Sequence, residues 1–435
     1  MSEASLLREV KSAPDVRRDR FGNAIDPTVS YARGLILRSN ADEILRQRQA
    51  YVIARERCRA LGEDSVYNLT GLIRGFRFRE GDAAKMKSYI HFGAMDDGEL
   101  VPLAIARMGG NPERDDGFLC NRVSAAILAT MMALVKKGDL VLSVVPADRC
   151  HPSLKNSVLF AGGRFVEVIG ADAFEKTLAD LGEKPAMVVV TSISPSKHHF
   201  PEAEAIRVIA GARRAGALVM IDDAHMAARL SVYGEHPALE LDADVAVWSL
   251  DKHVTGPRSG IVAGKKDLIS EIRAKAFMFG LEAQLGSIVA GFNAVTDFDP
   301  APIKRAADFA DIVRAELQDV LKGRAYRAGP GIAITGEDLL ELAMQQSGAS
   351  TSRIAPIEAT AVAAMTLLTE TGAVTIPVSG MPGSACVYRI MTYPDGERIG
   401  KSAIVEGTRS ALTAVSKLLS DPDATRALLL GPGKS

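Results

Sequence analysis

Residues 217–260 read ALVMIDDAHMAARLSVYGEHPALELDADVAVWSLDKHVTGPRSG and contain two apolar runs that each end abruptly in charged side chains. The first run is followed by the segment 222–225, Asp-Asp-Ala-His, and the second by Asp251 and Lys252. Short apolar runs of this kind predict buried parallel strands, whose carboxyl ends meet at one edge of a sheet. Open α/β sheets bind ligands at that edge. We therefore expect both polar segments to share one site.

The residue types in these segments favour one cofactor. A lysine amine forms a Schiff base with an aldehyde once part of its population is neutral, and partial burial favours the neutral form. A carboxylate at the same edge would keep a pyridine nitrogen protonated, which pyridoxal phosphate needs in order to act as an electron sink. The alternatives are a solvated lysine and an aspartate that caps the next helix. No metal is expected, because no His-x-x-x-His or second carboxylate cluster completes a ligand set around Asp222, Asp223 and His225.

The spacing of these residues also resembles a known superfamily. Strand-Asp222-x-Ala224-His225, followed after about thirty residues by strand-Ser249-x-x-Lys252, is similar to fold type I of the pyridoxal-phosphate enzymes, the aspartate aminotransferase superfamily. The resemblance implies that Lys252 forms the internal aldimine, that Asp222 faces the pyridine nitrogen, and that Ala224 and His225 lie close to the ring.

Three further segments resemble one group within that superfamily. Ser249-Leu-Asp-Lys252, the following Gly256-Pro-x-x-Gly260 and the early Asn68-x-Thr-Gly71 are most similar to the selenocysteine synthase group, which includes small-molecule ammonia-lyases. The Ala-His that follows Asp222 is more like aminotransferases and basic amino-acid decarboxylases. The resemblance therefore implies the cofactor and leaves the reaction open.

The pattern of the whole chain predicts an α/β protein. Strands and helices alternate with short loops from residue 140 to residue 300, which is typical of a mostly parallel sheet covered by helices. A chain of 435 residues exceeds what one core comfortably fills. We expect an N-terminal arm and helix (1–65), a large cofactor-binding domain (66–300) and a smaller α+β C-terminal domain (301–435). Within the first segment, 40–61 is a predicted helix with Asn40 as its cap.

Other residues are candidates for the same site. Val123, Ser124 and Ala125 begin a small-residue helix, whose free amides and positive dipole end suit a phosphate, and the resemblance implies this role; an ordinary capped core helix is the alternative. His151 precedes Pro152 at a helix start and is predicted to stack on the cofactor ring. Further predicted site residues are Ser194, near the ring oxygen, and two candidates for the substrate carboxylate, Arg389 and Arg74, which could instead be structural or solvated arginines.

Composition excludes several other classes of protein. The chain has 52 basic and 53 acidic side chains and a net charge of −1, which gives no electrostatic footprint for nucleic acid or anionic lipid. Its four cysteines are far apart and read as reduced thiols. No signal-peptide core or long apolar span is present, so we expect a cytoplasmic protein without membrane contact. The segment 396–402 resembles a nucleotide-binding P-loop but has one residue too few between its glycines.

These observations predict an enzyme that acts on a small amino acid. Lys252 would hold the cofactor and then move the α-proton as a general base. The resemblance favours β-elimination or β-replacement, and an aminotransferase or amino-acid decarboxylase of the same fold is the first alternative. A selenium or sulfur transferase acting on aminoacyl-tRNA is the second, although 12 basic against 10 acidic side chains in residues 1–65 offer little phosphate affinity. A homodimer or higher homo-oligomer with shared active sites is expected by the same resemblance.

Overall fold

A seven-stranded sheet forms the centre of the residues that the computed structural model describes, 17–87 and 96–431. Its order is β4-β10-β9-β8-β7-β5-β6, and its strands are β4 (Asp115–Cys120), β5 (Leu140–Val145), β6 (Arg164–Ile169), β7 (Met187–Thr191), β8 (Leu218–Asp222), β9 (Val245–Ser249) and β10 (Gly260–Lys265). β10 runs antiparallel to β4 and β9, and the five strands from β9 to β6 pair in parallel. The predicted mostly parallel α/β sheet is confirmed.

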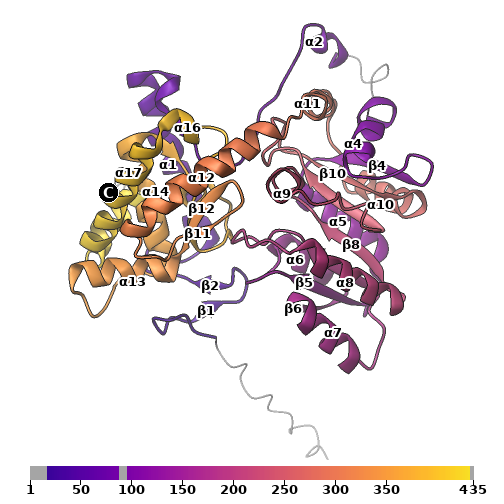
Figure 1. The fold of residues 1–435 in the computed structure, drawn as a ribbon, viewed down its shortest axis with the longest axis horizontal. Coiled ribbons are helices and arrows are strands. Elements are labelled where there is room, and N and C mark those ends of the chain that lie inside the picture. Colours follow the sequence, from indigo (N-terminus) through magenta and orange to yellow (C-terminus); the bar gives the residue numbers. More distant parts are fainter. Residues whose placement is uncertain (1–16, 88–95, 432–435) are drawn as a thin grey trace, which may run out of the picture.

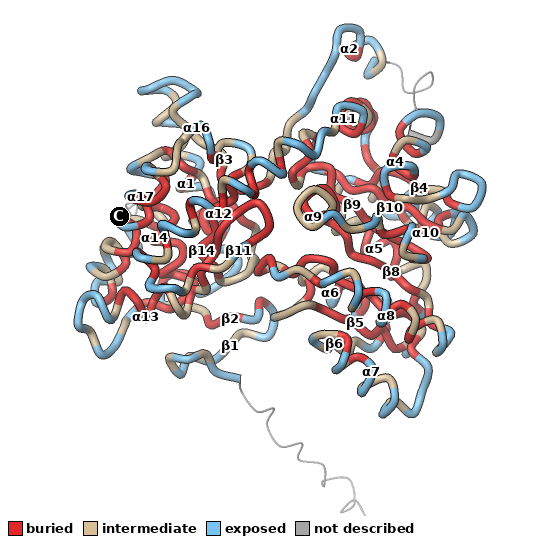
Figure 2. The backbone as a smooth tube through the Cα atoms, viewed as in Figure 1, coloured by how far each residue is buried: buried red, intermediate tan, exposed pale blue. Residues whose placement is uncertain are grey.

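Helices cover both faces of this sheet (Figure 1). They are α4 (Val101–Arg107), α5 (Val123–Leu134), α6 (Pro152–Phe160), α7 (Gly170–Asp180), α8 (Glu202–Arg214), α9 (Met226–Tyr233), α10 (Lys266–Met278) and α11 (Leu285–Thr296). Alternate residues of each strand pack on opposite faces. In β5, Val141 and Val145 join a core with α5, α6 and α10, whereas Leu142 and Val144 join a second core with α8 and α11. Because both faces are covered, the inner strands β5, β7 and β9 are buried along their whole length, whereas the edge strand β6 is only partly buried (Figure 2).

A second body contains the C-terminal part of the chain. Its elements are α12 (Ala301–Val320), β11 (Tyr326–Arg327), β12 (Gly331–Thr335), α13 (Gly336–Ser347), α14 (Pro356–Thr371), β13 (Ala373–Val374), α15 (Ile376–Ser379), β14 (Val387–Met391), α16 (Gly396–Ile399), α17 (Lys401–Leu418) and α18 (Pro422–Leu430). The antiparallel sheet β11-β12-β14 carries α12, α13 and α14. α14 is the central helix, packed against α13 and α17.

The N-terminal segment as far as residue 69 packs on this second body. Its elements are β1 (Ile25–Asp26), β2 (Tyr31–Ala32), α1 (Asn40–Leu61) and β3 (Tyr67–Asn68). The next helix, α2 (Asp82–Lys85), lies beside α11, whose Asn293 donates a 2.6 Å hydrogen bond to Asp82. Val29, Leu37 and Leu69 belong to the same core as α14, and α1 lies beside α14 and α18 (Figure 1). Residues 1–16, the start of the predicted arm, lie outside the described residues. The division into three domains stays a prediction.

One predicted helix cap is wrong. The helix 40–61 is confirmed as α1, but Asn40 is its first helical residue and Ser39 caps it. The Ser39 hydroxyl accepts a hydrogen bond from the Asp42 amide at 3.3 Å. Serine and asparagine are both common helix caps, so the sequence alone could not decide whether Ser39 or Asn40 caps this helix.

Two predictions from composition can be compared with the structure. The four cysteines are free thiols, as predicted. Within the described part of the chain, no helix combines the length and the apolar character that crossing a membrane requires.

Candidate active site

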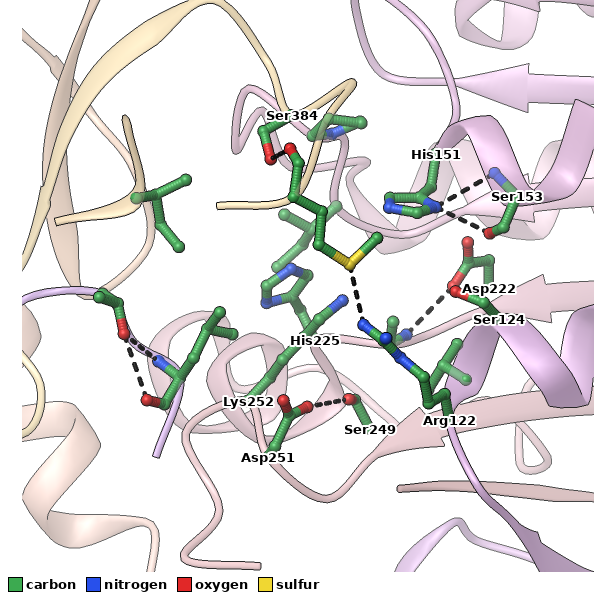
Figure 3. A pocket seen from close by; sticks show the side chains of 18 of the residues that line it. Arg122, Ser124, His151, Ser153, Asp222, His225, Ser249, Asp251, Lys252 and Ser384 are labelled. Atoms are coloured by element: carbon green, nitrogen blue, oxygen red, sulfur yellow. Dashed lines mark hydrogen bonds between the residues drawn. The ribbon is translucent and has the colours of Figure 1, made fainter. Parts of the chain in front are cut away.

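A cavity of about 160 Å³ lies where the carboxyl ends of β7, β8 and β9 face β14 and residues 70–74. Figure 3 shows its labelled side chains converging on one space. Most of the predicted site residues line it: Arg74, Val123, Ser124, His151, Ser194, Asp222, Ala224, His225, Ser249, Lys252 and Arg389. Ala125 lies in the first turn of α5 and does not line it. The sheet edge therefore gathers residues that are far apart in the sequence.

Lys252 and Asp222 share this cavity as oppositely charged, desolvated groups. Burial lowers the pKa of Lys252, and the charges of Asp222 and Asp251 oppose this shift. Burial raises the pKa of Asp222, while the positive charge of Lys252 opposes that shift. Among the described residues, no ion pair within 4 Å engages Asp222, whose Oδ1 accepts only a 3.3 Å hydrogen bond from the Ala224 amide. The site thus holds an amine that is easily neutralised and a carboxylate with spare acceptor capacity.

The segment 68–73 holds the Lys252 loop in place. The Ile73 amide donates to the Asp251 carbonyl at 2.8 Å, and the His253 amide donates to the Gly71 carbonyl at 3.0 Å. His253 has a φ of +63°, a conformation that is uncommon for residues other than glycine. Two backbone hydrogen bonds on either side of Lys252 therefore fix its position.

Glycines 256 and 260 let the chain pack closely beside the lysine. A Cβ on Gly256 would lie 2.6 Å from the Leu250 carbonyl oxygen, and one on Gly260 would lie 2.5 Å from the Val123 amide nitrogen. No side chain fits at either distance. Gly256 therefore lets the Lys252 loop fold back onto Leu250, and Gly260 lets the start of α5 pack against the start of β10.

Three arginines gather at the start of α5. Arg74, Arg122 and Arg258 line the cavity near a single carboxylate, that of Asp251. Arg74 Nε lies 3.5 Å from Asp251 Oδ2, and Asp251 Oδ1 accepts a 2.6 Å hydrogen bond from Ser249. Burial lowers the pKa of Arg258, and the charges of Arg74 and Arg122 lower it further. Together with the free amides of the helix terminus, this excess of donors suits a dianion.

Three histidines of the cavity are held neutral. Burial lowers the pKa of His151 and of His253 to about 3 each, and lowers that of His225 well below its ordinary range. His151 directly precedes α6 as predicted, and it also caps this helix, because its Nδ1 accepts a hydrogen bond from the Ser153 amide at 3.2 Å. Both ring nitrogens of His253 lack a hydrogen-bond partner among the described residues.

Asp223 has a structural role. Its two carboxylate oxygens accept hydrogen bonds from Arg229 at 3.0 and 2.6 Å, and Oδ1 also accepts one from Ser192 at 2.7 Å. Asp223 is fully buried and does not line the cavity. Because Asp223 pairs with Arg229, only Asp222 of these two neighbouring acidic residues faces the site.

The sequence did not mark four cavity residues with basic side chains as site residues: Arg122, Lys197, His253 and Arg258. Arg122 directly precedes the predicted phosphate-binding helix start, and Arg258 lies between Gly256 and Gly260, so proximity to these motifs was an available signal. Lys197 follows Ser194 by three residues in a buried turn, and no motif marked it. Its Nζ contacts His225 Nε2.

Known proteins resemble this chain over much of its length. A family model described as Cys/Met metabolism PLP-dependent enzyme matches residues 104–296. The chain is 35% identical over 400 residues to a UPF0425 pyridoxal phosphate-dependent protein of Methanothermobacter thermautotrophicus, covering 91% of this chain and 100% of that protein. It is 30% identical over 374 residues to a UPF0425 protein of Methanococcus maripaludis, MMP0002, covering 85% and 98%.

A solved structure matches the fold. The SepCysS–SepCysE N-terminal domain complex has a chain that aligns with a TM-score of 0.57 and 14% identity, covering 81% of this chain and 95% of that one. At this identity the likeness shows the fold alone. Fold, site and relatives together define an enzyme of fold type I that depends on pyridoxal phosphate. The chain belongs to the UPF0425 family of pyridoxal phosphate-dependent proteins. The predicted superfamily and cofactor are confirmed.

Proposed function

We propose that Lys252 holds the cofactor and then serves as the general base that moves the α-proton of a small amino acid. The observation that carries this proposal is the desolvated amine of Lys252, which shares the cavity with Asp222. When bound, pyridoxal phosphate supplies an electron sink for the charge that develops at the α-carbon. A lysine with a lowered pKa is a suitable base near neutral pH.

The surroundings of Lys252 support the fit of this cofactor. Asp222 has acceptor capacity that no described cation satisfies, which suits a protonated pyridine nitrogen. Arg74, Arg122 and Arg258 would hold the phosphate with the first amides of α5, contributed by Val123 and Ser124, and with Ser249 beside them. In our proposal His151 lies against the ring, and Ser194 and His225 lie near its oxygen.

The substrate would be oriented by Arg389. This arginine is 6% exposed on β14, and its Nε has no hydrogen-bond partner among the described residues. Burial lowers the pKa of Arg389 to about 10, so the guanidinium stays charged at neutral pH. A bidentate fork that keeps a free donor in a cavity suits an α-carboxylate.

The reaction that we propose is elimination or replacement of the β-substituent. The matching family is described as acting in Cys/Met metabolism, and the Ser249-x-x-Lys252-x-x-x-Gly256 segment supports the same choice by resemblance. Transamination and decarboxylation would use the same side chains and are the alternatives. The orientation of the bound substrate relative to Lys252 decides which of these reactions occurs.

The proposal is tested by the products and by two variants. Holoenzyme incubated with β-substituted amino acids should release a keto acid without an added acceptor. Transamination would require the acceptor, and decarboxylation would release CO₂. Lys252→Ala should lose the visible absorption of the bound cofactor, and Asp222→Asn should keep it while turnover falls about 10²–10⁴-fold. Full turnover in Lys252→Ala would contradict the proposal.

We propose further that the enzyme is a homodimer or higher homo-oligomer with shared active sites. Phe277, Met278 and Phe279 are 52%, 69% and 54% exposed, and Phe76 and Phe78 are 55% and 47% exposed. Exposed apolar groups of this kind mark interaction surfaces. Light scattering should give a multiple of the chain mass, and a monomeric, active holoenzyme would contradict this proposal.

A further inference from the structure

Two cations of the cavity lie apart from the arginines at α5 and have no acidic partner. Lys197 follows β7 and is 7% exposed, and Arg389 on β14 is 6% exposed. No ion pair within 4 Å engages either of them in the described part of the chain, where Lys197 contacts the neutral His225 and Arg389 donates to the Pro195 carbonyl at 3.0 Å. Buried cations are normally paired. Lys197 and Arg389 are therefore suited to bind the anionic groups of a ligand.

The count of charges in the cavity leads to the same conclusion. Six basic and two acidic side chains line it: Arg74, Arg122, Lys197, Lys252, Arg258 and Arg389 against Asp222 and Asp251. A phosphate that carries about two negative charges, together with Asp251, would balance the three arginines near α5. Asp222 would balance the pyridine nitrogen, and Lys252 is used in holding the cofactor. The side chains of Lys197 and Arg389 are left without an acidic group to balance a positive charge on either of them.

The turn that carries Lys197 is fixed from both bodies of the molecule. Lys197 has a φ of +74°. The Ser196 hydroxyl donates to Asp148 at 2.7 Å, and the Tyr326 hydroxyl donates to the Ser196 carbonyl at 2.9 Å. Strained backbone that is held by surrounding contacts is typical of functional sites.

The electrostatics around Lys197 also favour an anion. Burial and the positive charges of Arg389 and Lys252 lower the pKa of Lys197 well below its ordinary range, against the opposing charges of Asp148 and Asp222. A neighbouring anion would stabilise the ammonium form and reverse this shift.

We infer that the substrate is an amino acid with a second anionic group, a carboxylate or a phosphate ester, which Lys197 binds while Arg389 holds the α-carboxylate. This inference rests on the proposed function, because it assigns the arginines near α5 to the cofactor. It adds Lys197 as the residue that selects the substrate class.

The test compares ligands that carry two anionic groups, called dianions below, with a ligand that carries one. Propionate, succinate and 3-phosphopropionate (the phosphate ester of 3-hydroxypropionate) are titrated into holoenzyme that retains its visible band, and binding is measured by calorimetry. We expect succinate or 3-phosphopropionate to bind at least about tenfold more tightly than propionate, as an added charged hydrogen bond implies. The tighter of the two identifies the second group as a carboxylate or a phosphate ester.

Variants assign the preference to Lys197. Lys197→Gln should abolish the preference for the dianion and leave propionate binding nearly unchanged, and Lys197→Arg should restore part of the preference. Lys155→Gln, an exposed lysine on α6, makes the same charge change outside the cavity and should have no effect.

Two results would overturn the inference. One is equal affinity of wild-type holoenzyme for propionate and both dianions, which needs no variant to fold. The other is a preference that survives Lys197→Gln. A protein that never acquires the visible band would instead contradict the proposed function, so the two failures are distinguishable.

Discussion

Gly71 shows how one small residue brings two segments together at the site. It has a φ of +70°, and a Cβ at this position would lie 2.9 Å from His253 Nε2 and 3.2 Å from Met391 Cγ. The Asn68 side chain and the Thr70 hydroxyl close the turn, since Thr70 Oγ1 donates to Asn68 Oδ1 at 2.6 Å. The sequence could not predict the contact with His253, because this residue comes from a loop 182 residues later in the chain.

Replacing Gly71 should therefore lower the stability of the protein by more than the strain of its left-handed backbone accounts for. Gly71→Ala adds both a left-handed strain and a clash with His253, whereas Gly280→Ala adds the strain only, because Gly280 has a φ of +62° and nothing within 4 Å of its Cβ position. We expect Gly71→Ala to lower the free energy of unfolding by at least about 1 kcal/mol more than Gly280→Ala, and to weaken cofactor binding. Urea denaturation of both variants measures the difference. Equal losses would show that the contact with His253 carries no strain.

Apart from Arg74 and Arg389, the site residues that the sequence predicted end or follow β7, β8 and β9, or lie at the start of α5 and α6. Asp222 and Lys252 are examples, because an apolar run in the sequence shows where a buried parallel strand ends. The sequence did not indicate that Lys197 belongs to the site. Its position depends on the left-handed turn after Ser194 and on Tyr326 from the other body, and neither leaves a pattern in the local sequence.

The sheet depends on a charged group at the edge opposite the site. Asp244 precedes β9 and is 1% exposed. Its carboxylate accepts from the Val219 amide at 2.7 Å and from Arg213 at 2.5 Å, and lies 2.6 Å from Lys265 Nζ. It thus joins β8, β9, β10 and α8. Burial raises the pKa of Asp244, but the hydrogen bonds of Arg213 and Lys265 lower it more, so the net pKa is below its ordinary 3.8.

Asp244→Asn should destabilise the fold at neutral pH by about 2 kcal/mol, because a charged acceptor of several hydrogen bonds is replaced by a neutral one. The lowered pKa means that the stabilisation is present above pH 3.8 and is lost as the pH falls through the folded pKa. Asp242→Asn is the control, since Asp242 also pairs with Arg213 but its side chain is 64% exposed, and it should cost less than about 1 kcal/mol. Equal effects of the two variants in urea would contradict this account.

Some elements could be predicted and others could not. The apolar runs 140–145 and 187–191 predict strands, and β5 and β7 have these bounds. The pattern does not predict β4, because Asp115, Asp116 and Gly117 begin it and these residue types are depleted in strands. It does not predict α14 either, because this helix is buried on nearly all sides and lacks the polar face that gives a helix its period. The segment 374–378 predicts a strand, but only Ala373–Val374 forms one (β13), and α15 follows it with Pro377 at a position that helices accept.

The two bodies of the molecule meet at the cavity through the segment 67–73. The Leu69 amide donates to the Val374 carbonyl, the Met391 amide donates to the Leu69 carbonyl, and residues 71–73 pair with the Lys252 loop. The neutral His151, His225 and His253 line the cavity at this meeting point, where His225 and His253 are buried and His151 is half-buried. Their burial links the stability of the whole protein to pH.

Stability without added cofactor should fall as the pH drops below 6.5. The folded protein keeps the pKa of His253 near 3, whereas the unfolded chain takes up a proton at its ordinary 6.5. The unfolded state therefore binds more protons between these values, and the stability lost at pH 5.5 is about 1.4 kcal/mol per histidine. His253→Asn, which suits the left-handed conformation, should show a smaller drop in urea midpoint between pH 7.5 and pH 5.5. An unchanged drop would contradict a neutral buried His253.

Chemical mapping of the cofactor's attachment tests the central claim most directly. Holoenzyme is reduced with borohydride, digested, and examined by mass spectrometry for a phosphopyridoxyl group. We predict the group on the peptide that contains Lys252 and its absence from the peptide that contains Lys197. A group on Lys197, or an unmodified Lys252 in protein that retains the cofactor, would contradict the account.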